Sequence, residues 1–106
     1  MASGRLASEN VTTVNSNVQI YQVPTGFNAS FTINACNRGT SNAKIRISLS
    51  DSGTPALGEY VDFDVIVYPK ESYQRTGVVL SSGQYVFFHT DQAGISVNVY
   101  GFEETV

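Results

Sequence analysis

Hydrophobic and polar residues alternate along most of this chain. The alternation is strict in Phe27–Ala35, Lys44–Ser50 and Ile95–Val99. A period of two places successive side chains on opposite faces of a strand, so each run predicts a half-buried β-strand. A further strand is predicted over 61–67, with Val61, Phe63, Val65 and Val67 on one face and Asp62, Asp64 and Ile66 on the other. Less regular candidates are 18–23, 74–80 and 84–90.

Turn-forming residues separate these runs. Clusters of Gly, Pro, Asn, Asp and Ser recur at intervals of roughly 8–12 residues, which is typical of sandwiches and barrels. No stretch shows a helical period. The sequence therefore predicts one all-β domain, an antiparallel β-sandwich of seven or eight strands with either a jelly-roll or an immunoglobulin-like topology.

The first seventeen residues have a different character. They are rich in Ser, Thr and Asn, and their sizeable apolar residues are Leu6, Val11 and Val14. We predict that residues 1–17 form a polar, extended N-terminal arm and that residues 18–106 form the sandwich domain. The segment is either a frayed terminus or an arm that orders against a neighbouring subunit, by strand addition or by wrapping.

Two of the predicted strands suggest a hairpin. If 43–50 pairs with 59–67, one register matches apolar residues with each other and opposite charges with each other, and such cross-strand pairs stabilise a sheet. In that register the opposed residues are Ile45 and Phe63, Arg46 and Asp62, and Lys44 and Asp64.

Charge is scarce in this protein. Of 106 residues, 42% are hydrophobic and only 14% are charged, and the net charge is -3. Six basic residues are spread along the chain, which argues against a nucleic-acid partner because phosphate binding needs clustered Lys and Arg. A surface poor in charge is easily desolvated and suits burial against neighbouring subunits.

Candidate chemistry is sparse. A single cysteine, Cys36, and a single histidine, His89, provide neither a disulfide nor a four-ligand zinc site. Asp62 and Asp64, with Glu59 and Asp51 nearby in sequence, could form a calcium or glycosidase carboxylate pair. Pairing with Lys44 and Arg46 is the simpler interpretation, so we predict no enzyme activity, no metal and no cofactor. No apolar run is long enough for a bilayer and the N-terminus has no signal-peptide core, so we expect synthesis in the cytoplasm and no membrane partner.

Tyrosine offers one alternative function. Five tyrosines on predicted outward faces could form an aromatic platform for a glycan, although such platforms usually contain Trp and this chain has none. Tyr is also favoured on strands and at protein interfaces. The five are Tyr60, Tyr68, Tyr73, Tyr85 and Tyr100.

Three stretches are similar to a known family: Ile33–Thr40, Tyr73–Gly83 and Val97–Glu104. They resemble small virion proteins of tailed bacteriophages, especially phages of marine bacteria and cyanobacteria. The opening MASGRLAS also resembles the short polar start of these proteins.

The resemblance implies a structural role on the phage particle, with no catalytic residue to carry over. A capsid decoration (cement) protein that binds capsid subunits is the expectation, with a neck, tail or fibre protein as the alternative within the virion. A homo-oligomer is expected because repeated copies usually assemble with closed symmetry. The resemblance implies a trimer, because capsid decoration proteins often sit on threefold positions. The residues predicted to contact neighbours are Arg5, Leu6, Val11, Val14, Tyr60, Tyr68 and Tyr100.

Overall fold

The computed structural model describes residues 3–106, which form eight strands and one short 3₁₀ helix. The elements are β1 (Ser3–Val11), β2 (Val18–Gln22), β3 (Phe27–Asn37), β4 (Ala43–Ser50), η1 (Leu57–Glu59), β5 (Tyr60–Val67), β6 (Ser72–Leu80), β7 (Tyr85–Thr90) and β8 (Ile95–Thr105). Within residues 3–106 the three-residue η1 is the only helical segment, so no helix of this part of the chain is long enough to span a membrane.

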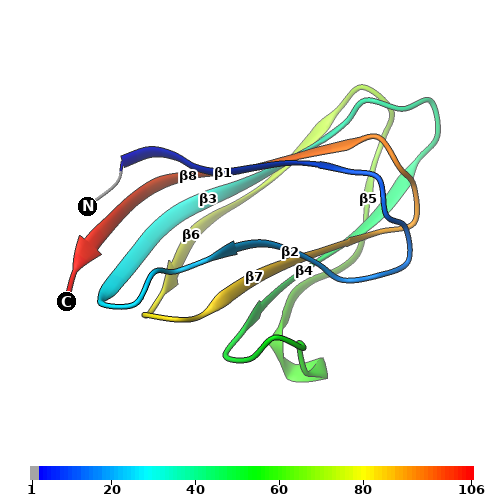
Figure 1. Cartoon of the computed structure of the whole chain (residues 1–106). Coiled ribbons are helices and arrows are strands. Elements are labelled where there is room, and N and C mark those ends of the chain that lie inside the picture. The colour runs from blue at the N-terminus through cyan, green and yellow to red at the C-terminus, as the bar shows by residue number, and fades with distance from the viewer. Residues whose placement is uncertain (1–2) are drawn as a thin grey trace.

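The strands form two antiparallel four-stranded sheets, which lie as two layers in Figure 1. Sheet A has the order β1-β8-β3-β6, and sheet B has the order β2-β7-β4-β5. Four hydrogen-bonded pairs are nested along the chain: β1 with β8, β2 with β7, β3 with β6, and β4 with β5. A long hairpin rolled up on itself gives this order, which is the jelly-roll arrangement of a β-sandwich. The predicted fold class is confirmed, and the strand order differs from that of an immunoglobulin domain.

Alternation along the central strands creates the core. Every second residue of β3, from Ala29 to Ala35, is at most 5% exposed, and the intervening residues lie on the outer face. Ile45 and Ile47 of β4 and Phe88 of β7 supply the facing layer from sheet B. The two inner faces pack through these apolar side chains, and their burial is the main stabilising contribution to the fold.

All four edge strands contain extra residues that interrupt the ladder. The extra residues are Leu6 in β1, Ile20 in β2, Phe63 with Asp64 and also Val61 in β5, and Thr76 with Gly77 in β6. The central ladders, β3–β8 and β4–β7, run without a register shift. Bulges break the regular row of unpaired N–H and C=O groups and twist an edge away from its neighbour, so they oppose edge-to-edge pairing.

The expected N-terminal arm differs from the observed structure. Ser3–Val11 is strand β1, which pairs with β8 through Ile95–Phe102 and forms one edge of sheet A. Most of its side chains are exposed or half-buried because an edge strand packs against little, which explains why the sequence reads as polar. Within the described residues there is no boundary at residue 17 between an arm and a body, and residues 1 and 2 lie outside the described part.

The predicted pairing of β4 with β5 is confirmed, but its predicted register was wrong. Ile45 lies opposite Val65, and Lys44 lies opposite Ile66. The cause is the bulge at Phe63–Asp64, where Asp64 has a φ of 56°. Since this extra residue reverses the alternation, Asp62 is buried and Phe63 is exposed, the opposite of what the pattern predicted.

Candidate interaction surface

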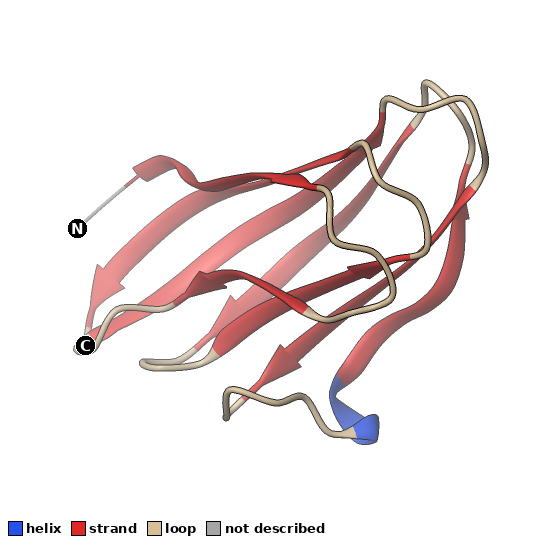
Figure 2. Cartoon of the chain, turned by 45° about the vertical axis from the view of Figure 1, so that its right-hand side comes forward, coloured by secondary structure: helices blue, strands red, loops and turns tan. Residues whose placement is uncertain are grey.

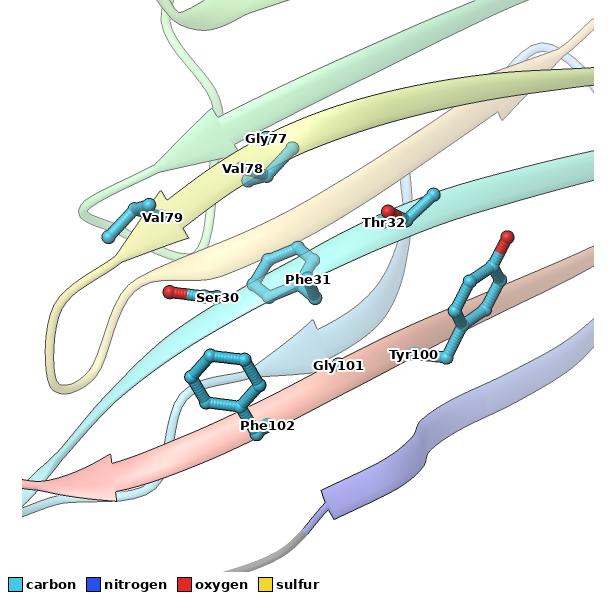
Figure 3. A pocket seen from close by; sticks show the side chains of 9 residues that line it. All are labelled: Ser30, Phe31, Thr32, Gly77, Val78, Val79, Tyr100, Gly101 and Phe102. Carbon is cyan, nitrogen blue, oxygen red and sulfur yellow. The ribbon is translucent and has the colours of Figure 1, made fainter.

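The outer face of sheet A carries a hollow of about 370 Å³. It lies over the ends of β8, β3 and β6, and Figure 3 shows Tyr100 and Phe102 on β8 on either side of Gly101. Nine residues line it: Ser30, Phe31, Thr32, Gly77, Val78, Val79, Tyr100, Gly101 and Phe102. None of the nine is charged, and the volume lies near the lower end of the roughly 300–1,000 Å³ of ligand sites.

Two glycines shape the floor of this hollow. Gly101 faces Phe31 across the β3–β8 ladder, and a Cβ atom at Gly101 would lie 2.1 Å from the backbone oxygen of Ser30. Gly77 occupies the β6 bulge with a φ of 71°, a conformation that L side chains rarely adopt. β8 therefore approaches β3 closely at Gly101, whereas a Cβ atom at Gly77 would meet no atom within 4 Å.

The walls of the hollow are aromatic and aliphatic. Phe102 is 45% exposed and Val79 is 67% exposed. Both occupy outward-facing strand positions, where polar side chains are usual. Tyr100 is held upright because Gln74 of β6 donates a hydrogen bond to its hydroxyl oxygen at 2.9 Å. This hydrogen bond spans β3 and orients the Tyr100 side chain through two uncharged groups.

Beyond the hollow, the same face of sheet A is polar and includes Arg5 on β1 and Glu104 on β8. Asn34 lies opposite Asn98, and Cys36 lies opposite Ser96. The side-chain oxygen of Asn34 is buried and has no hydrogen-bond partner within the described chain. This part of the face presents amide and hydroxyl groups, which suit water or a neutral polar partner surface.

The outer face of sheet B carries a self-contained aromatic and charged cluster. Arg46 lies 4.0 Å from the ring centre of Phe63, and its Nε is 2.7 Å from Asp64 Oδ1. Tyr60 meets Phe63 edge to face at 5.3 Å and accepts a hydrogen bond from Asn17. The hydrogen bond from Arg46 lowers the pKa of Asp64, so both charges are already paired. Because Arg46 already contacts Asp64 and Phe63, it is less available to bind an external anion.

His89 lies beside this cluster, directly opposite Arg46 in the β4–β7 ladder. Burial lowers the pKa of His89, and the positive charge of Arg46 lowers it further, against the opposing effect of Asp64 and Asp91. Its Nδ1 is buried without a hydrogen-bond partner, and so is the hydroxyl of Ser48 on β4. The lowered pKa favours the neutral imidazole at physiological pH.

A polar cluster joins the two sheets between β5 and β6. Asp62 accepts a hydrogen bond from Arg75 Nε at 2.9 Å, a second from the Arg75 guanidinium, and one from the Tyr73 hydroxyl. Burial alone would raise the pKa of Asp62, but the hydrogen bonds from Arg75 and Tyr73 outweigh it and the pKa lies below its ordinary value. The same carboxylate was predicted to pair with Arg46 on the outer face, and that prediction was wrong because of the bulge.

The opposite side of the sandwich has a second polar link between the sheets. Tyr21 of β2 donates a hydrogen bond to Glu103 of β8, and both side chains are buried. Burial raises the pKa of Tyr21, and the hydrogen bond to Glu103 raises it further. Both links join sheet A to sheet B.

The residues predicted to contact neighbours are scattered in the structure. Arg5 and Tyr100 lie opposite each other on β1 and β8, Leu6 is half-buried at the β1 bulge, and Val14 is exposed in the β1–β2 connection. Tyr60 is on sheet B, and Tyr68 is exposed just after β5. Val11 is only 2% exposed and packs in the core, so it is not available to a partner.

The five tyrosines do not form one platform. Tyr100 lies on the outer face of sheet A, whereas Tyr60 and Tyr85 lie on sheet B. Tyr73 was predicted to point outward, but it is half-buried and binds Asp62. A glycan site built from these tyrosines together is therefore not assembled by this fold.

The carboxylates also lie apart. Asp62 binds Arg75 and Asp64 binds Arg46, while Glu59 accepts hydrogen bonds from Ser50 and from two backbone N–H groups of its own loop. Among residues 3–106 no group of three or more His, Cys, Asp or Glu side chains is arranged to hold a metal ion.

Sequence reasoning identified Tyr100 but not the other walls of the hollow. The signal was present, since Val97 and Val99 face the core and place Tyr100 and Phe102 on the outer face by alternation. The hollow itself depends on the pairing of Gly101 with Phe31, which are 70 residues apart in a ladder that no local pattern reveals.

No protein-family model, no curated protein and no solved structure matches this chain.

Proposed function

We propose that this protein is a non-enzymatic structural subunit of a phage particle, where it binds neighbouring protein subunits as a capsid decoration protein. The observation that carries the proposal is the outer face of sheet A. The lining of its hollow, on β3, β6 and β8, is uncharged, and Val79, Tyr100 and Phe102 are exposed around it. Exposed, contiguous apolar side chains rimmed by polar residues are typical of protein interaction sites.

The edge strands favour contacts through faces. Because each of the four edges contains a bulge, a partner strand would not find an uninterrupted row of backbone groups to pair with. Strand addition along β1 is therefore the less favoured of the two ways by which the N-terminal segment was expected to contact a neighbour. The flat outer face of sheet A is the better surface.

Two further considerations support a place on the virion. Jelly rolls occur in viral capsid proteins and also in lectins and cupins, so the fold is compatible with this role by analogy alone. Of the three stretches that resemble phage virion proteins, Tyr73–Gly83 and Val97–Glu104 include residues of β6 and β8 that line the hollow. A neck, tail or fibre position would use the same surface.

Binding to particles tests the proposal. Particles of the parent phage that lack this chain are mixed with the purified protein and sedimented. We expect saturable co-sedimentation that survives moderate salt, because the lining of the hollow contains no charged residue. A protein that stays in the supernatant at every concentration would contradict the proposed function.

A further inference from the structure

The connection between β4 and β5 ends in a prominent apolar side chain. Leu57, at the start of η1, is 87% exposed, more than any other large hydrophobic side chain of the described residues. Figure 2 shows η1 projecting from one end of the sandwich. Because Leu57 buries little of its surface within its own chain, its side chain contributes little to the stability of the fold.

This turn is rigid for its size. Glu59 accepts hydrogen bonds from the backbone N–H of Ala56 at 2.7 Å and of Asp51 at 3.2 Å, and from the Ser50 hydroxyl at 2.9 Å. The backbone hydrogen bonds lower the pKa of Glu59, so its carboxylate stays ionised and keeps the loop closed at neutral pH. Leu57 is therefore presented on a preorganised support, which lowers the entropy cost of binding.

We propose that Leu57 inserts into the hollow on sheet A of a second copy of this protein. The tip, residues 52–58, contains no charged side chain, and neither does the lining of the hollow. The two surfaces are thus complementary in polarity, one an apolar projection and the other an apolar depression. In a protein of net charge -3 these are uncharged regions that can approach without repulsion.

A chain cannot fill its own hollow in this fold. Leu57 belongs to the connection between two strands of sheet B, whereas the hollow lies on the outer face of sheet A, on the far side of the core. The contact is therefore heterologous, and repeated copies close into a ring or continue as a chain. The inference rests on the proposed function, since it names the occupant of the same surface.

Two charge substitutions test the projection and the hollow independently. Leu57→Asp removes the projection, and Val79→Asp places a charge in the wall of the hollow. Both side chains are exposed, so neither substitution should affect folding. We expect each variant to weaken self-association by about tenfold or more, as truncation of a central interface residue does. Sedimentation velocity over a concentration series measures the effect.

Matched controls add the same charge elsewhere. Ser72→Asp lies on the outer face of β6 away from the hollow, and Asn42→Asp lies at the end of β4 opposite to the η1 loop. Both control variants should assemble as the wild-type protein does. Leu57→Ala and Val79→Ala repeat the test without added charge, and circular dichroism verifies the fold of every variant.

Mixing the two variants gives the decisive result. The Leu57→Asp protein keeps an intact hollow, and the Val79→Asp protein keeps an intact projection, so the mixture should form a one-to-one dimer and nothing larger. A monomeric wild-type protein at all concentrations, a Leu57→Asp variant that assembles normally, or a mixture that stays monomeric would each overturn the inference.

The outcomes separate the inference from the proposed function. A protein that binds particles but fails the mixing experiment would refute the Leu57 contact alone. A protein that self-associates through Leu57 but never binds particles would refute the virion role alone.

Discussion

Arg75 on β6 binds Asp62 on β5 through two guanidinium nitrogens, and this ion pair joins the two sheets of the sandwich. The carboxylate is almost completely buried, whereas the arginine reaches the surface. A buried carboxylate that loses its cation is poorly compensated, so the pair holds β5 and β6 in a fixed relation.

Replacing Arg75 should destabilise the protein. Arg75→Ala leaves Asp62 with the Tyr73 hydroxyl alone, and we expect a loss of about 1–3 kcal/mol, the usual cost of an unsatisfied buried group. Urea unfolding measures it. Arg46→Ala is the matched control, because the carboxylate of its pair, Asp64, is 42% exposed against 3% for Asp62, so its loss should cost less. Equal effects of the two substitutions would contradict the assigned role of Arg75.

Acid should reduce the stability that the ion pair of Asp62 with Arg75 contributes. The pKa of Asp62 in the folded protein lies below its ordinary value of 3.8, so the unfolded chain takes up the proton first. The stability contributed by Asp62 is complete above that value and is lost as the pH falls through the folded pKa. The free energy of unfolding of the wild type should therefore approach that of Asp62→Asn in acid, and a constant difference would exclude this linkage.

His89 should produce a separate pH dependence. Burial and the neighbouring Arg46 hold its pKa below 6.5 in the folded protein. Its contribution to stability is complete above 6.5 and decreases as the pH falls below that value. Between pH 6.5 and the pH range in which carboxylates titrate, the free energy of unfolding should decrease less steeply in His89→Gln than in the wild type. An unchanged slope in this variant would assign the decline to other groups.

Gly101 should tolerate no side chain. In Gly101→Ala the added carbon would lie 2.1 Å from the Ser30 oxygen and 2.6 Å from Phe31 Cα, and relief requires opening the central β3–β8 ladder. We expect a loss of about 1–3 kcal/mol in thermal or urea unfolding, as overpacking typically costs. Gly58→Ala is the control, since no atom lies within 4 Å of the added carbon. A neutral Gly101→Ala variant would show that the strands are less close than described.

The glycan-binding alternative is tested at Tyr60 and Tyr100. Because Tyr60 and Tyr100 lie on different sheets, no single sugar can stack on both. We expect a glycan array to show no binding that both Tyr60→Ala and Tyr100→Ala weaken. A ligand whose binding depends on both residues would favour the glycan-binding alternative over assembly.

The fold class was predictable because the core follows alternation. Phe31, Ile33 and Ala35 each face inward as the pattern of Phe27–Ala35 requires, and this pattern is local. The edge strands were less predictable, since β1 buries little and leaves no alternation to detect.

The bulge in β5 accounts for the errors in the predicted register of β4 with β5. At Asp64 an extra residue moves Asp62 to the interior and Phe63 to the surface, and nothing in the residues 61–67 themselves signals it. A bulge at an edge depends on the neighbouring strand and on the twist of the sheet, which are tertiary properties. The hollow likewise depends on tertiary pairing, because Gly101 of β8 and Gly77 of β6 line it from either side of β3.

Quantitative mass spectrometry of purified, gradient-banded particles of the parent phage tests the central claim most directly. The account predicts that this chain is present in a copy number comparable to that of the major capsid protein. A much lower copy number would move it to the neck, tail or fibre. Its complete absence from the particles would contradict the virion role.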